Sequence, residues 1–192
     1  MDRNTFKYIV GIDEAGRGPL AGPVVASCVC FKKTPQFELR DSKKLSPSKR
    51  EQLFPKIKNV SHYSFSLVNN KVIDDINIFN ATQLAFNLAI SRFLVKTNFS
   101  KDDVLFIIDG PHFRDNCQVK YKCVISADNL VPEVSAASIL AKVLRDRIMI
   151  SYDKFFPEWY FSQHKGYPTK LHRQAIKKQG FSPLHRLSFK SD

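Results

Sequence analysis

Short apolar runs alternate along this chain with longer segments of helical periodicity. The first two runs, at residues 7–13 and 22–31, are rich in β-branched residues between glycines, which predicts two strands joined as a hairpin. Three more strands are expected at HYSFSLVN, VLFIID and YKCVIS, the last two as fully buried strands. Because the strands come first as a pair and then alternate with helices, we expect an α/β fold with a mixed sheet.

Four helices are expected around these strands. The first begins at Ser46, which can cap it, with Pro47 in the first helical position, and Pro55 is expected to end or kink it. The other three are expected at about residues 74–95, 132–155 and 169–180, the last with Thr169 as its cap and Gly180 as its stop.

Charge is the most informative part of the composition. The chain of 192 residues carries 30 Lys and Arg against 18 Asp and Glu, a net charge of +12. Such an excess favours a polyanionic partner, either nucleic acid or an anionic membrane surface. Bases gather at residues 32–58 and 160–190, and the second stretch contains no acid. Two basic stretches in one small chain favour nucleic acid, although most charged runs are simply solvated surface.

A membrane role is disfavoured by the sequence. No uninterrupted apolar run reaches the roughly 18 residues of a membrane span, and no basic amphipathic helix has a wide aromatic face. The N-terminus lacks the pattern of a signal peptide, so we expect a cytoplasmic protein. Nothing marks a linker. We therefore expect one domain over residues 1–192, in which residues from about 157 to 192 form a basic C-terminal helical segment.

Four carboxylates stand against the basic trend, close to the ends of apolar runs. Asp13 and Glu14 follow YIVGI, Asp109 follows VLFII, and Asp128 follows YKCVISA. The carboxyl ends of strands are where α/β sheets build sites, and a half-buried acid is costly unless it is paired or binds metal. Convergent carboxylates suit Mg²⁺, and two such ions would stabilise the attacking and leaving oxygens of a phosphodiester. The alternative is that each acid caps a helix or pairs with a Lys or Arg.

Other catalytic patterns are absent from the sequence. It contains no G-x-S-x-G, H-E-x-x-H or C-x-x-C motif. The glycines of GIDEAGRGPLAGP have the spacing G-x-G-x-x-x-G, and Pro19 and Pro23 would interrupt the helix that a dinucleotide-binding motif needs. A tight loop whose backbone approaches a sugar or phosphate closely, with Arg17 beside it, fits this segment better.

Five blocks, in order and over nearly the whole chain, resemble ribonuclease HII: GIDEAGRGPLAGPVVAS, DSKKLSPSKRE, IDG, VPEVSAASILAKVLRDRIM and HKGYPTKLHRQAIKKQGFSPLHRLSF. The resemblance implies a ribonuclease H-like fold, a mixed five-stranded sheet flanked by helices, with a helical C-terminal part. It implies hydrolysis of RNA in RNA–DNA hybrids and nicking on the 5′ side of single ribonucleotides in duplex DNA. The implied products are 3′-hydroxyl and 5′-phosphate ends. The implied cofactor is Mg²⁺ or Mn²⁺, two ions with substrate bound, and we expect a monomer.

The resemblance also implies roles for individual residues. The catalytic metal ligands would be Asp13, Glu14, Asp109 and Asp128. The ribose 2′-hydroxyl would be recognised by Gly16, Arg17 and Gly18, largely through their backbone, while Tyr167 would pack on the neighbouring deoxyribose. Phosphate contacts would come from Ser42, Lys43, Lys44, Ser138 and Lys142. Ser138 and Lys142 are four residues apart and so share a helix face. For Lys44, Lys142 and Asn77 a structural role is equally open.

One residue departs from the family pattern. Ala127 stands where the family usually has glycine, which would narrow the backbone freedom beside Asp128. The sister family, ribonuclease HIII, has an extra N-terminal domain and lacks the arginine of the glycine element, and both points argue against it.

A basic nucleic-acid-binding module without catalysis is the competing hypothesis. It explains the charge but gives no reason for the acids, and it predicts that magnesium leaves the nucleic acid unchanged.

Overall fold

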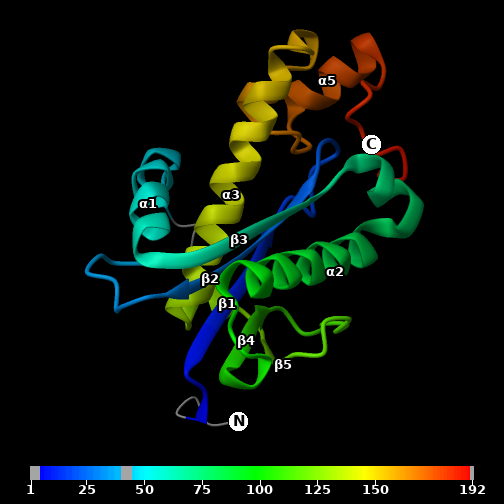
Figure 1. The fold of residues 1–192 in the computed structure, drawn as a ribbon. Helices are drawn as coiled ribbons and strands as arrows, with labels where there is room; N and C mark the ends of the chain where they lie inside the picture. Colours follow the sequence, from blue (N-terminus) through cyan, green and yellow to red (C-terminus); the bar gives the residue numbers. More distant parts are fainter. Residues whose placement is uncertain (1–4, 40–44, 191–192) are drawn as a thin grey trace.

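A mixed sheet forms the centre of the molecule (Figure 1). The structure, a computed structural model, describes residues 5–39 and 45–190. Its five-stranded sheet has the order β3-β2-β1-β4-β5. The strands are β1 (Tyr8–Ala15), β2 (Val24–Phe31), β3 (Ser61–Val68), β4 (Val104–Asp109) and β5 (Lys120–Val124). Strands β1, β2 and β3 pair antiparallel, whereas β4 pairs parallel with both β1 and β5. The predicted hairpin and the predicted mixed sheet are therefore confirmed.

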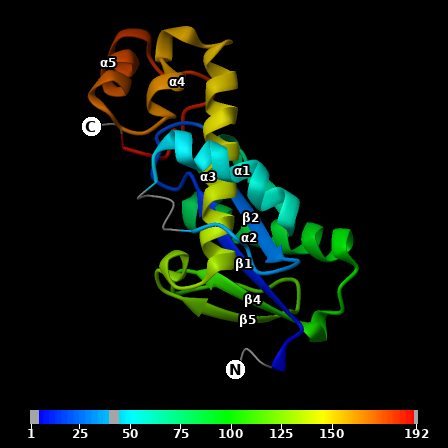
Figure 2. The ribbon, with the colours of Figure 1, turned by 90° about the vertical axis from the view of Figure 1, so that its left-hand side faces the viewer.

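Helices cover both faces of this sheet. Helix α2 lies on one face, and α1 and α3 lie on the other (Figures 1 and 2). The α-helices are α1 (Pro47–Val60), α2 (Asn70–Thr97), α3 (Pro132–Asp153), α4 (Phe161–His164) and α5 (Lys170–Gln179). Short 3-10 helices are η3 (Lys101–Asp103), η4 (Ala127–Asn129) and η5 (Pro157–Trp159). The segment from η5 to Lys190, called here the C-terminal cap, packs at the far end of α3 (Figure 2).

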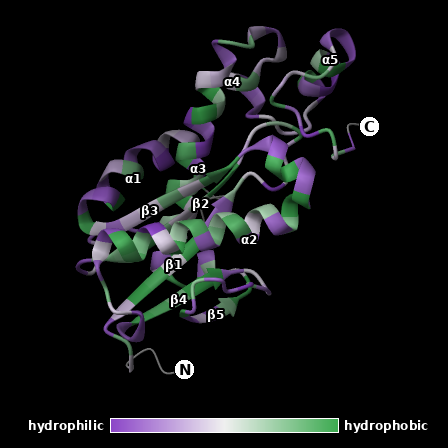
Figure 3. Cartoon of the chain, turned by 45° about the vertical axis from the view of Figure 1, so that its right-hand side comes forward, coloured by the Kyte–Doolittle hydropathy of each residue, from purple (hydrophilic) through white to green (hydrophobic). Residues whose placement is uncertain are grey.

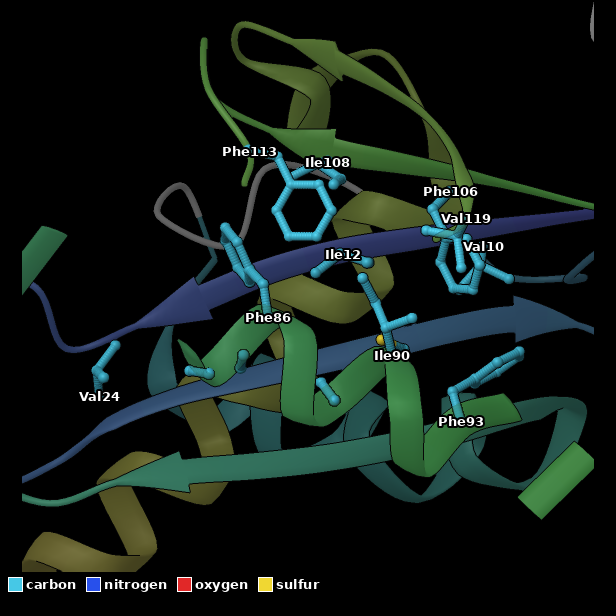
Figure 4. Close-up of a cluster of buried hydrophobic side chains, with 14 of the residues drawn as sticks. Val10, Ile12, Val24, Phe86, Ile90, Phe93, Phe106, Ile108, Phe113 and Val119 are labelled. Carbon is cyan, nitrogen blue, oxygen red and sulfur yellow. The ribbon is translucent and has the colours of Figure 1, made fainter. Parts of the chain in front are cut away.

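The main core lies between α2 and the sheet. Val10 and Ile12 alternate along β1 and point towards Phe86, Ile90 and Phe93 of α2 (Figure 4). All five are buried, and burying each such side chain contributes about 1.5–3 kcal/mol. Figure 3 shows the hydrophobic residues gathered on the central strands and hydrophilic residues on the outer faces of α1 and α5.

Gly11 brings α3 against the opposite face of β1. A Cβ atom at this position would lie 2.1 Å from the backbone carbon of Glu133, so only glycine allows the approach. Because side chains alternate along a strand, Asp13 points to the same side as Gly11, towards α3. The close packing of α3 on β1 therefore places helix side chains next to Asp13.

Two helices differ from their predicted limits. Helix α1 does not end at Pro55 but continues to Val60. Pro55 is exposed, so water can satisfy the carbonyl that lacks a partner, while Leu53, Phe54 and Ile57 anchor the helix. Helix α2 begins at Asn70, earlier than predicted, and is interrupted at Asn77, which has a φ of 64°.

Helix α2 also bears on the expectation that the chain does not span a membrane. By length and composition alone it could cross one, although half of its most apolar window is buried in the molecule. Its apolar side chains pack on the sheet, and this makes it the core helix of the fold.

The strands also differ from the prediction in their burial and in their limits. Strand β5 is not fully buried: it is the edge strand, and its first three residues are exposed. Charged residues are common on such edges, because they oppose pairing with another chain. Strand β1 continues past its predicted end at Asp13 and includes Glu14 and Ala15, since pairing with β2 extends it. Asp128 lies beyond β5, in η4.

Candidate active site

Two aspartates meet where β1 separates from β4. The parallel pairing of these strands ends at Ile12 with Ile108, whereas β1 stays paired with β2 as far as Ala15. Asp13 and Asp109 each follow the last parallel pair by one residue and lie on the face covered by α3. Carboxyl ends of parallel strands are where α/β sheets place their sites. The register therefore sets the two carboxylates side by side.

A third aspartate joins them from the short helix η4. Single carboxylate oxygens of Asp13, Asp109 and Asp128 all lie within 4.8 Å of one another. The backbone N–H of Ala127 donates to Asp109 Oδ1 at 2.7 Å, which ties η4 to the end of β4. Ser126, and not Ala127, adopts the left-handed conformation, with a φ of 56°. Alanine at position 127 therefore fits the turn, and its side chain is buried against Leu105 and Ile107.

The electrostatics of this cluster suit a divalent cation. Asp13 is only 5% exposed, and burial raises the pKa of its carboxyl well above the usual value, with Glu14 and Asp109 adding to the effect. A hydrogen bond from Ser138 lowers the pKa in part, and the Glu14 N–H donates to Asp13 Oδ1 at 2.7 Å. Crowded carboxylate oxygens are the ligands that Mg²⁺ and Mn²⁺ prefer, and a bound cation would relieve their repulsion. The three aspartates therefore fit the metal site that the sequence predicted.

Glu14 lies beside the cluster and is not part of it. Its carboxylate is 3.6 Å from the guanidinium of Arg17, and its side chain is 14% exposed. It lines the same cavity as Asp13 and Asp109, a hollow of about 250 Å³. The structure thus brings three of the four predicted ligands together and places the fourth on the wall of the same cavity.

Most predicted substrate-binding residues line this cavity as well. They are Gly16, Arg17, Gly18, Ser138, Lys142 and Tyr167. Ser42, Lys43 and Lys44 lie outside the described residues. A single hollow thus joins Asp13 and Asp109 of the acidic cluster to one face of α3 and to residues Gly16–Gly18, called here the glycine loop, with Tyr167 contributed by the C-terminal cap.

Lys142 and Asn77 each have a structural contact. The Lys142 ammonium lies 2.9 Å from Asp146 and 4.9 Å from the centre of the Tyr167 ring, so it links α3 to Tyr167. The Asn77 side chain accepts a hydrogen bond from the Asn80 N–H at 3.1 Å and so caps the second part of α2.

The sequence did not single out three arginines whose positions in the fold are unusual. Arg50 of α1 lines the cavity and donates to the Leu45 carbonyl at 2.6 Å; the sequence showed it only as one base among many. Arg186, counted among the bases of a surface stretch, is 1% exposed, and Arg145 is completely buried. Full burial of arginine is rare, so nothing in a charge pattern could have indicated it.

A second hollow of about 490 Å³ continues from the first. It shares Arg50, Lys142 and Tyr167 with the cavity and extends between α1, α3 and the C-terminal cap to Lys165 and Thr169. Glu51 and Asp146 also line it. Arg50, Lys142 and Lys165 are the lysine and arginine side chains that line this groove.

Comparisons with known proteins agree with this geometry. The family model of ribonuclease HII matches residues 10–192. Ribonuclease HII of Clostridioides difficile (strain 630) is 46% identical over 186 residues, which cover 96% of this chain and 70% of the relative. Ribonuclease HII of Borrelia duttonii (strain Ly) is 43% identical over 183 residues, 94% of this chain and 98% of the relative. The fold resembles that in the PCNA:RNase HII complex from Archaeoglobus fulgidus, with a TM-score of 0.77, 22% identity and 95% coverage of both chains. The chain therefore belongs to the ribonuclease HII family and is a ribonuclease H, a hydrolase that cuts RNA paired with DNA.

Proposed function

We propose that this ribonuclease H nicks duplex DNA on the 5′ side of a single embedded ribonucleotide and also cuts the RNA strand of long hybrids. The products would carry 3′-hydroxyl and 5′-phosphate ends. The observation that carries the proposal is the convergence of three carboxylates within 4.8 Å, beside a cavity that also contains Gly16–Gly18 and Tyr167.

Asp13, Asp109 and Asp128, with Glu14 on the cavity wall, are the residues that would hold two Mg²⁺ or Mn²⁺ ions. Bound there, the ions would supply activation of a water nucleophile and stabilisation of charge on the leaving 3′ oxygen. The protein contributes fixed ligand geometry, since Ser138 hydrogen-bonds Asp13 and the Ala127 N–H holds Asp109. Preset ligands need no reorganisation when the substrate binds.

Recognition of the ribonucleotide is assigned in this proposal to other residues of the same cavity. The 2′-hydroxyl distinguishes RNA from DNA, and the backbone of the loop Gly16–Gly18 is proposed to bind it. Tyr167 is proposed to pack on the adjoining deoxyribose, which would select an RNA–DNA junction. Ser138, Lys142 and Arg50 contact phosphates in this proposal and position the duplex without recognising its sequence. We extend the phosphate contacts to Ser42, Lys43 and Lys44 on the family resemblance alone.

The chain is proposed to act as a monomer in the cytoplasm. The placement in the cytoplasm rests on the family, whose members act on nucleic acid.

Cleavage of a labelled DNA duplex with one embedded ribonucleotide tests the proposal, with Mg²⁺, Mn²⁺ or a chelator and an all-DNA duplex as control. We expect a metal-dependent nick 5′ of the ribonucleotide and an intact control. Cleavage of long hybrids alone would retain the metal site but contradict recognition of a junction by Gly16–Gly18 and Tyr167. Tight binding without cleavage in either metal would instead favour the non-catalytic binding module.

A further inference from the structure

The chain segment after α5 returns to the glycine loop and pairs with it. The Arg186 N–H donates to the Leu20 carbonyl at 2.8 Å, and the Gly22 N–H donates to the Leu184 carbonyl at 2.8 Å. Ala21 and His185 face each other in this short antiparallel bridge. The segment Ser182–Arg186 is therefore joined to the loop that follows Gly18 by strand-type hydrogen bonds.

The Arg186 side chain binds carbonyls of the glycine loop from inside the protein. Its Nη2 donates to the Gly16 carbonyl at 2.6 Å and its Nη1 to the Arg17 carbonyl at 3.0 Å. Its Nε and Nη2 both donate to the Gly22 carbonyl, at 3.0 and 2.8 Å. The planar fork of a guanidinium holds several acceptors in one fixed geometry, which a lysine cannot do.

These hydrogen bonds determine where the amides of the loop point. In a trans peptide the N–H lies opposite the preceding carbonyl. With the carbonyls of Gly16 and Arg17 directed at buried Arg186, the N–H groups of Arg17 and Gly18 are directed away from it. Both residues line the cavity, and their amides are donors of the kind that a ribose hydroxyl requires.

His185, the neighbour of Arg186, reaches Tyr167 through a chain of hydrogen bonds. The Ser182 N–H donates to His185 Nδ1 at 2.8 Å, so the proton of His185 is on Nε2. His185 Nε2 then donates to His172 Nε2 at 3.0 Å, and His172 Nδ1 donates to the Tyr167 carbonyl at 3.0 Å. His172 and His185 are 0% and 2% exposed, and burial lowers the pKa of both to about 4. Both rings are therefore neutral at pH 7, as this chain of donors and acceptors demands.

We propose that Ser182–Arg186 is a positioning element for ribonucleotide recognition. Arg186 determines the direction of the amides of Arg17 and Gly18, and His185 determines the position of Tyr167 through His172. One short segment thus fixes both recognition elements relative to each other, although neither side chain touches the substrate. The inference rests on the proposed function and deepens it, because it assigns residues that control discrimination between ribose and deoxyribose.

A structural role alone would not require these side chains. A buried arginine and two buried histidines carry a desolvation cost that apolar residues of similar size avoid. Here their polar atoms are directed to the backbone of Gly16, Arg17 and Tyr167, the residues proposed to meet the substrate. Small displacements at such positions have large effects on recognition.

Matched substitutions test the proposal. His185→Leu removes the donor to His172, whereas His185→Gln keeps a donor near the position of Nε2. Arg186→Met removes the fork from the loop carbonyls. For each protein, the dissociation constants for an all-DNA duplex and for the same duplex with one ribonucleotide are measured in chelator, and their ratio gives the discrimination. We expect His185→Leu and Arg186→Met to lower this ratio by at least about tenfold, or to near one, and His185→Gln to restore most of it.

The control is Phe93→Leu, a substitution in the core between α2 and the sheet. It lowers stability without touching the cap, and a smaller folded fraction weakens binding to both duplexes equally. Its ratio should therefore equal that of the wild type. If folded His185→Leu keeps the wild-type ratio, the inference is overturned, and this variant decides the matter even where Arg186→Met does not fold. If the wild-type protein itself shows a ratio near one, recognition of the 2′-hydroxyl in the proposed function fails first.

Discussion

The two glycines of the glycine loop, Gly16 and Gly18, satisfy different physical requirements. Gly16 has a φ of +108°, and a Cβ there would lie 2.3 Å from Arg145 Nε and 2.5 Å from the Pro23 carbonyl oxygen. At Gly18 a Cβ would meet no atom of the described residues within 4 Å. The fold therefore needs glycine at position 16, while glycine at position 18 keeps space free on the cavity wall.

Substitution by alanine separates these two roles. Gly18→Ala should leave the melting temperature within about 2 °C of the wild type, since nothing in the described structure is displaced. It should lower kcat/KM on a single embedded ribonucleotide by about tenfold or more, because the methyl group keeps the ribose from the backbone. Gly16→Ala should instead lower the melting temperature by several degrees. Full activity of Gly18→Ala would contradict the assignment of this loop.

Among single residues, the sequence predicts those site residues whose position follows from the pattern of their immediate neighbours. Asp13 and Asp109 were found because each accompanies an apolar strand. The inward turn of Asp128 depends on the left-handed Ser126, which no periodicity indicates. Arg186 and His185 were not predicted, because Arg186 acts on Gly16, 170 positions away, and His185 acts on His172 of α5, 13 positions away, and neither contact follows from local pattern.

At the scale of elements, the parallel register of β1 and β4 creates the site. The alternation of strands and helices was sufficient to predict a mixed sheet, and the hairpin of β1 and β2 followed from two apolar runs between glycines. The limits of β1 were wrong because they depend on the antiparallel partner β2, whose pairing carries β1 past Asp13. Helix α1 continues past Pro55, because the tertiary packing of its apolar face stabilises the helix more than one missing hydrogen bond destabilises it.

The C-terminal cap should lose stability in mild acid. Burial is the main cause that lowers the pKa of His172 and His185 from 6.5 to about 4, and the neighbouring His164 adds to it. Because the unfolded chain binds these protons more readily, their contribution is complete above about pH 6.5 and is lost as the pH falls towards 4. The slope is at most about 1.4 kcal/mol per pH unit for each histidine.

Denaturant unfolding at several pH values between 4.5 and 7 measures this dependence. Asp13, whose raised pKa acts in the opposite direction, is present in both the wild type and His185→Gln, so the difference between the two proteins isolates the histidine. We expect a shallower fall in stability for His185→Gln. Parallel curves for the two proteins would show that His185 is not a buried neutral histidine.

In the molecule as a whole, the basic side chains of the groove and the three clustered aspartates occupy different places. The chain carries a net charge of +12, yet three aspartates converge at one point on the sheet. The basic groove beside them includes Arg50, Lys142 and Lys165. This arrangement suits an enzyme that attracts a polyanion along its surface and performs chemistry where negative charge is concentrated.

The salt dependence of binding tests the phosphate contacts that are proposed for that groove. Lys142→Met should weaken binding of all-DNA and ribonucleotide-containing duplexes alike and reduce the slope of log affinity against log salt by about 1. Lys96→Met is a matched control, because Lys96 lines neither the cavity nor the groove and contacts Tyr63 instead. An unchanged slope in Lys142→Met would remove Lys142 from the phosphate contacts.

We propose that the three convergent aspartates form the metal-dependent hydrolytic site. Asp109→Asn tests it most directly, because asparagine keeps the size of the side chain and an oxygen to accept from the Ala127 N–H while removing the charge. We predict that cleavage of a duplex with one embedded ribonucleotide falls at least about a thousandfold at saturating Mg²⁺, while affinity for the duplex stays within about twofold. Cleavage by Asp109→Asn at the wild-type rate would contradict the assignment of the site.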